Sequence, residues 1–197
     1  MRIPASRGTV LGAFADDVDG AGWTASWSDV TSWLMERAEA RFGPRDPRWF
    51  FTGLEFADVE APTTYYPANR PFHVGIRLTA AAAASPAEAY FQLAHEVVHL
   101  LGPSPTHAKA NVLEEGVATV FQQETVAAVG LPATVSHPSY LAAAGKVACL
   151  EAFAQDAVRS VRALYPDLRD LTEDELGRIV PGLPAGLAGA LCSPFRR

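Results

Sequence analysis

One predicted helix, residues 85–102, constrains this sequence more than any other segment. Most of its residues, AEAYFQLAHEVVHLLG from 87 to 102, are apolar or aromatic, which is typical of a helix buried inside a fold. The same helix carries His95, Glu96 and His99. Two imidazoles and a carboxylate are costly to bury without partners. The fold must therefore supply partners for them, and a metal ion is the simplest candidate.

These three residues have the spacing of an H-E-x-x-H motif. Residues four positions apart lie on one face of a helix, so His95 and His99 can reach the same ion. Zinc binds imidazole nitrogens and keeps one position open for water in catalytic sites. Glu96 lies beside the two ligands, where it can take a proton from that water. The alternative is a metal-free core, in which both histidines are hydrogen-bonded and Glu96 is exposed.

A catalytic zinc usually has a third protein ligand, and the sequence offers three candidates. Glu115 lies in NVLEEGVATVF, on a second predicted helix that a Gly-Pro break turns back alongside the first. Glu114 is its neighbour but points about 100° away around that helix. His107 follows the motif more closely, yet it stands two residues later than in the metzincin pattern H-E-x-x-H-x-x-G-x-x-H. The residue pattern alone leaves all three open.

HEVVH followed by LEEGVA resembles the gluzincin family of zinc metallopeptidases, over residues 90–121. In that family the third ligand is a glutamate on the next helix, often followed by glycine, an apolar residue and alanine, as in residues 115–118 here. The resemblance therefore implies Glu115 as third ligand, Zn²⁺ as cofactor, Glu96 as general base and a peptide or protein as substrate. The chain departs from the family at Thr119, where the family has an aspartate, so the residue that supports His95 is unassigned.

The resemblance also implies a zincin-like fold, in which the metal-binding helix lies under a small sheet whose edge strand binds an extended substrate. FHVGIRL, residues 72–78, precedes the helix and is expected to be that strand, with His73 an ordinary strand residue. A donor to the oxyanion is also needed. Tyr140, His137 and His107 are candidates, each with a plainer alternative role in packing or at the surface, and we expect Tyr140.

The predicted elements run in the order of one helix, a small sheet and a helical half, which is typical of an α+β protein. We expect a single domain, residues 1–197, with a lobe of residues 1–103 holding a mixed or antiparallel sheet and the metal-binding helix, and a helical lobe of residues 104–197. The predicted strands are 48–56, 63–68 and 72–78, with the last two paired as a hairpin. The predicted helices are 26–43 with Ser28 as its cap, 85–102, 104–130, 137–165 and a short helix after a Thr172–Glu175 capping box.

Charge and apolar patterning exclude several classes of function. The 197-residue chain carries a formal net charge of −6, and its arginines are scattered, so no basic surface for nucleic acid is expected. No run approaches the roughly 18 apolar residues of a membrane span, and the N-terminus lacks the pattern of a signal peptide. The two cysteines form no disulfide framework. We therefore expect a cytoplasmic protein.

The leading hypothesis from the sequence is a zinc metallopeptidase that cleaves peptide bonds with an activated water. A second hypothesis keeps the zincin-like fold but gives it non-proteolytic metal chemistry, or no catalysis and a role in binding. The absence of a recognisable pro-segment motivates it, because a free cytoplasmic protease needs restraint. A third hypothesis has no metal at all. The sequence predicts neither the substrate nor the oligomeric state.

Overall fold

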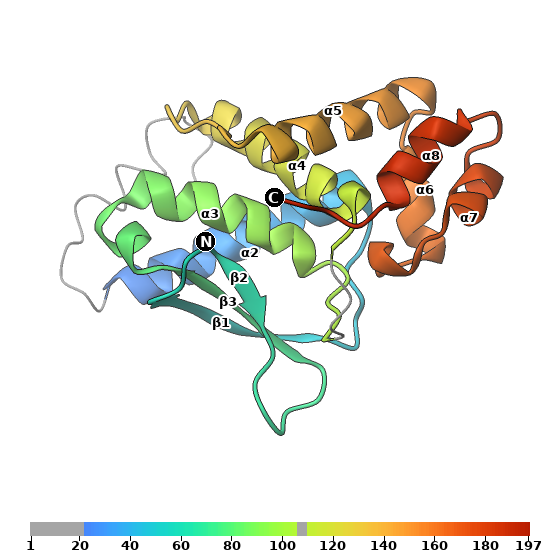
Figure 1. Ribbon diagram of the computed structural model, residues 1–197. Helices are drawn as coiled ribbons and strands as arrows, with labels where there is room; N and C mark the ends of the chain where they lie inside the picture. Colours follow the sequence, from blue (N-terminus) through green and yellow to red (C-terminus); the bar gives the residue numbers. More distant parts are fainter. Residues whose placement is uncertain (1–21, 106–109) are drawn as a thin grey trace.

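The computed structural model describes the backbone of residues 22–105 and 110–197, with side chains from residue 27 onward. This part of the chain is α+β, with seven α-helices and a three-stranded sheet (Figure 1). The elements are α2 (Gly22–Phe42), β1 (Phe50–Ala57), β2 (Thr63–Tyr65), β3 (His73–Thr79), η1 (Ala80–Ala84), α3 (Pro86–His99), α4 (Val112–Val129), α5 (Pro138–Phe153), α6 (Ala157–Leu164), η2 (Leu168–Asp170), α7 (Glu173–Ile179) and α8 (Ala185–Cys192).

The sheet is mixed and has the strand order β1-β3-β2. β1 runs parallel to β3, and β2 pairs with β3 in antiparallel register from Thr63↔Arg77 to Tyr65↔Gly75. The predicted pairing of the last two strands is therefore confirmed. The prediction that residues 72–78 form the edge strand is wrong, because β1 crosses over to pair with the other side of β3. In the part of the chain that the structure describes, the edge strands are β1 and β2.

α3 lies at the centre of the molecule, between the sheet and α4 (Figure 1). Its two sides are both covered, which explains why its sequence is apolar almost all round. The helix begins as predicted, because the Ser85 hydroxyl accepts a hydrogen bond from the Glu88 backbone N–H at 3.3 Å. Gln92 then ties α3 to the end of β3, since its side-chain oxygen accepts from the Thr79 N–H at 3.0 Å.

The sequence predicts a helix that begins near Ser104, but α4 begins at Val112. Its N-cap is Asn111, whose side-chain oxygen accepts from the Glu114 N–H at 2.9 Å. The Asn111 amide also donates to the Leu168 carbonyl at 2.7 Å, a contact 57 residues away in the sequence. This distant partner fixes the helix start, whereas Ser104 and the proline after it resemble a start signal only locally. The end of α4 at Gly130, in the left-handed region with φ +71°, is as predicted.

Two other predicted helix boundaries are wrong. α2 begins at Gly22, so Ser28 lies inside the helix and caps nothing. The predicted helix 137–165 is split into α5 and α6 at residues 154–156, where Asp156 adopts a left-handed backbone with φ +56°. No glycine or proline marks this break, so the sequence carries no strong signal for it. The Thr172–Glu175 capping box is confirmed at the start of α7.

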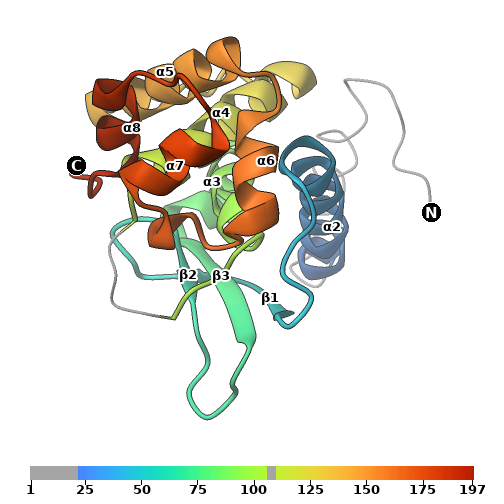
Figure 2. The ribbon, with the colours of Figure 1, turned by 90° about the vertical axis from the view of Figure 1, so that its right-hand side faces the viewer.

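One buried arginine on α6 binds the C-terminal ends of two other helices, α2 and α3. Arg162 donates hydrogen bonds to the carbonyls of Phe42, Gly43, Pro44 and Leu101, at 2.9–3.1 Å. These carbonyls lie at or just after the ends of α2 and α3, where helix carbonyls lack partners within the helix. α6, α7 and α8 gather at the end of the molecule that faces the viewer in Figure 2. Arg162 thereby anchors the C-terminal end of the helix that carries the H-E-x-x-H motif.

Candidate metal centre

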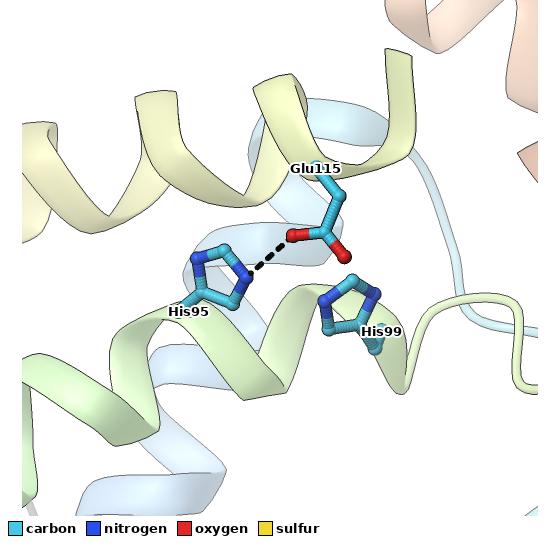
Figure 3. A group of neighbouring side chains, drawn as sticks. All are labelled: His95, His99 and Glu115. Carbon is cyan, nitrogen blue, oxygen red and sulfur yellow. Dashed lines mark hydrogen bonds and ion pairs between the residues drawn. The ribbon is translucent and has the colours of Figure 1, made fainter. Parts of the chain in front are cut away.

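The structure brings together His95, His99 and Glu115, the three residues that the sequence predicts as metal ligands (Figure 3). The histidines project from α3, and Glu115 projects toward them from the first turns of α4. One potential ligand atom from each residue lies within 4.8 Å of the other two. The His95 Nε2 and Glu115 Oε2 atoms are 3.1 Å apart. Two helices therefore direct three potential metal-ligand atoms toward one another.

Packing between α3, α4 and α5 sets this arrangement. Gln122 on α4 donates to the Phe91 carbonyl on α3 at 2.9 Å, which fixes how the two helices align. Gly116, next to Glu115, has no room for a side chain, since a Cβ there would lie 2.6 Å from the Ala143 carbonyl oxygen. The glycine therefore lets α5 approach α4 closely, at the point where α5 carries Tyr140 toward the cluster.

The donor set suits a divalent metal. Two imidazole nitrogens and one carboxylate oxygen match the ligands of catalytic zinc, which are placed tetrahedrally about 2.0–2.1 Å from the ion. Ligand atoms in such a tetrahedron are about 3.3 Å from one another. The 3.1 Å between His95 Nε2 and Glu115 Oε2 is close to this value, and all three ligand atoms lie within 4.8 Å of one another.

The electrostatics of the cluster favour positive charge. Burial opposes ionisation of Glu115, but the hydrogen bond from His95 and the charges of both histidines hold its pKa at about 2. Burial also opposes a charge on His99, but the neighbouring carboxylates, Glu114 first among them, raise the pKa of that imidazole to about 10. Without a metal, the carboxylates therefore draw a proton onto His99. A dication between the same groups would meet the same attraction.

Glu96 lines the same cleft as the three candidate ligands and is only 5% exposed. Burial raises the pKa of its carboxyl, and the nearby histidines act in the opposite direction. A carboxylate whose pKa is raised is a stronger base than an ordinary one. The structure thus gives Glu96 the surroundings expected of a general base, rather than the exposed position of the metal-free alternative.

Tyr140 faces the cluster from the start of α5. Its ring lies edge-on to the His95 ring, with 5.6 Å between the ring centroids, and it lines the cleft. The Tyr140 hydroxyl accepts a hydrogen bond from Arg197 Nε at 2.8 Å. Burial and the Glu115 carboxylate raise the pKa of the phenol, so its proton is retained. The hydroxyl can therefore donate to an oxygen atom in the cleft.

Among the described residues, the other sequence candidates contribute no atom to the three-residue cluster. His137 is exposed and its Nδ1 is 2.8 Å from the Ser139 hydroxyl, with no place in the cleft lining. His73 Nδ1 is hydrogen-bonded to the Pro71 carbonyl at the start of β3, as expected of a strand residue. His107 lies outside the described residues. Glu114 does approach the cluster, but its Oε1 contacts His99 Nδ1 at 2.8 Å.

The cleft itself has a volume of about 170 Å³ and includes residues that the sequence analysis missed. Thr63 and Thr64, on edge strand β2, form part of its wall. Arg169 and Arg197 bring positive charge to it from the C-terminal segment. No local pattern pointed to these residues, because each reaches the cleft only through the packing of distant segments.

Comparison with family models, with curated proteins and with solved structures gave no match for this chain. The described residues contain no helix with the length and apolar character needed to cross a membrane.

Proposed function

We propose that this protein is a zinc-dependent metallopeptidase. The observation that carries the proposal is the convergence of His95, His99 and Glu115 in one cleft with the buried Glu96 carboxylate. A zinc ion held by these three side chains would supply the Lewis acidity that activates water and polarises a carbonyl. The resemblance of residues 90–121 to gluzincins supports the same assignment.

The protein's own groups would act as follows. Glu96 takes the proton of the attacking water and passes it to the leaving amine. Tyr140 donates its hydroxyl proton as a hydrogen bond to the carbonyl oxygen, on which negative charge develops. Arg197 keeps the lone pairs of that hydroxyl occupied, since it donates to the Tyr140 oxygen. Each of these groups lines the cleft that contains the three candidate ligands.

Edge strand β2 supports a peptide as the substrate. Within the described residues β2 pairs with β3 on one side only, so the backbone N–H and C=O groups of its opposite side have no strand partner there. An extended peptide can add to such an edge by main-chain hydrogen bonds. Thr63 and Thr64 of this strand line the cleft, which would place the added peptide beside the candidate metal centre.

The test combines metal content with hydrolysis. Purified protein should hold about one zinc ion per chain and cleave members of a mixed peptide library, with products identified by mass spectrometry. Glu96→Gln keeps the shape of the side chain but removes the base, so this variant should retain zinc and lose cleavage. A Glu96→Gln protein with full activity, or a wild-type protein that binds no zinc, contradicts the proposal.

A second candidate function is non-proteolytic hydrolysis of a small anionic molecule. The cleft of about 170 Å³ is smaller than the roughly 300–1,000 Å³ of most ligand pockets, and Arg169 and Arg197 line it. Both features suit a compact substrate with a carboxylate or phosphate. Small acidic amides and esters, assayed beside the peptide library, separate the two functions, since only a peptidase also cleaves neutral extended peptides.

A further inference from the structure

The two neighbouring glutamates at the start of α4 make different contacts. Glu115 Oε2 lies 3.1 Å from His95 Nε2, inside the cluster. Glu114 Oε1 lies 2.8 Å from His99 Nδ1, the shorter of the two contacts. Because the two nitrogens of an imidazole point in different directions, an oxygen bonded to Nδ1 does not reach an ion bound at Nε2. The contact to Glu114 therefore leaves Nε2 as the ring nitrogen of His99 that is available to the cluster.

From this geometry we propose that Glu114 is a positioning residue, which holds His99 in the orientation and tautomer that presents Nε2 to the metal. The inference rests on the proposed metal centre. Metal-bound histidines usually donate their second ring N–H to such an acceptor, which fixes the ring and makes it a better ligand. Glu114 is not itself a ligand, since its hydrogen bond lies on the far side of the imidazole.

Contacts of its backbone and of its side chain both hold Glu114 in place. Its backbone N–H donates to the Asn111 cap, so the residue is fixed in the first turn of α4. Its Oε2 atom is buried and makes no hydrogen bond within the described residues, but lies 3.6 Å from Arg169 Nε. Arg169 Nε is in turn bonded to Asp167 at 2.8 Å. The carboxylate thus directs its one side-chain hydrogen bond at His99, with a cation behind it.

Thr119 does not take this supporting role. It stands where gluzincins have an aspartate, but its hydroxyl donates to the Glu115 carbonyl of its own helix at 2.7 Å. The supporting carboxylate in this chain therefore comes from position 114 and acts on the second histidine of the motif. Of the two adjacent glutamates, Glu115 is then the metal ligand and Glu114 is the residue that orients His99.

The experiment measures zinc affinity, by competition with a chromophoric chelator, rather than activity. Wild type, Glu114→Ala, Glu114→Gln and Thr119→Val are compared, after thermal unfolding has shown that each is folded without metal. We expect Glu114→Ala to bind zinc about 10- to 100-fold more weakly. Glu114→Gln should recover part of this loss, because its amide oxygen still accepts from Nδ1. Thr119→Val, the control, should keep the wild-type affinity.

A second measurement needs no variant. Nitrogen-15 NMR of the zinc-loaded wild type should show His99 coordinated through Nε2 and protonated at Nδ1. Coordination through Nδ1, or wild-type affinity in Glu114→Ala, overturns the inference while leaving the metal centre intact. A wild-type protein that binds no zinc overturns the proposed function itself, so the two failures are distinguishable.

Discussion

Arg197 and Tyr140 are 57 residues apart, yet Arg197 Nε donates to the Tyr140 hydroxyl at 2.8 Å. The guanidinium carbon also lies 5.6 Å from the centroid of the tyrosine ring. This contact joins the last residue of the sequence to the first turn of α5, beside His95. It orients the phenol and leaves the hydroxyl proton for another acceptor.

The first prediction concerns this hydroxyl. Tyr140→Phe removes the proposed oxyanion donor but keeps the ring that packs against His95, so zinc content should stay at the wild-type level. Loss of such a donor lowers kcat by about 10²- to 10³-fold. Steady-state kinetics on a cleaved peptide, with zinc measured in the same preparation, check this. An unchanged kcat would remove Tyr140 from the mechanism, while zinc loss would show that its role is to shape the metal site.

The second prediction is that zinc stabilises the fold. The metal would bind to groups that are assembled only in the native state, so its removal should lower Tm. Zinc at about 1,000 times its Kd contributes about 4 kcal/mol to the free energy of unfolding. Differential scanning calorimetry with and without chelator measures the effect, and Glu115→Gln serves as the control because it should respond weakly to zinc. Equal Tm values for wild type with and without the ion would argue for a metal-free core.

The third prediction concerns the close approach of α4 and α5. A Cβ at Gly116 would lie 2.6 Å from both the Ala143 carbonyl oxygen and Val147 Cγ2, so Gly116→Ala forces the helices apart. We expect a loss of about 1–3 kcal/mol in the free energy of unfolding, measured by urea denaturation. Gly145→Ala is the matched control, because a Cβ at this exposed helical glycine meets nothing within 4 Å. That variant should be neutral or slightly more stable. Equal effects of the two substitutions would contradict the packing argument.

The fourth prediction concerns acid stability at α7. Hydrogen bonds from the Thr172 side chain, and further ones from Tyr165 and the Thr172 N–H, lower the pKa of Glu175 to about 2. Because this folded-state pKa lies below the ordinary value of 4.5, the carboxylate stabilises the fold above about pH 4.5 and loses that effect as the pH falls toward about 2. The stability difference between wild type and Glu175→Gln should therefore shrink over this range. Asp174→Asn is the control, and a difference independent of pH would contradict the prediction.

Much of the candidate site could be predicted from the sequence because its signals are local. The H-E-x-x-H spacing puts His95 and His99 on one face of any helix, and Ser85 with the proline after it marks where that helix begins. The histidine spacing and the helix start depend on helix periodicity and capping, which act over a few residues. The third ligand is different, because these local signals leave Glu114, Glu115 and His107 open. Only the resemblance of residues 115–118 to the gluzincin motif favours Glu115, whose carboxylate lies 3.1 Å from His95.

The features that were missed depend on distant contacts. The start of α4 follows from the bond between Asn111 and Leu168, and the position of β3 inside the sheet follows from its pairing with β1. The sequence presents Glu114 only as a candidate ligand, because its contact with His99 Nδ1 depends on how α3 and α4 pack. Such contacts join segments tens of residues apart, and no pattern within one segment encodes them.

The hydrogen bonds of Arg162 make the end of the histidine-bearing helix depend on α6. Its guanidinium satisfies carbonyls after both α2 and α3, and burial lowers the pKa of this side chain to about 10 without removing its charge at neutral pH. A fragment that ends before α6 would expose those carbonyls and release the end of the histidine-bearing helix. The three candidate ligands, which span only residues 95–115, are therefore not a transplantable peptide module: their geometry is a property of nearly the whole described chain.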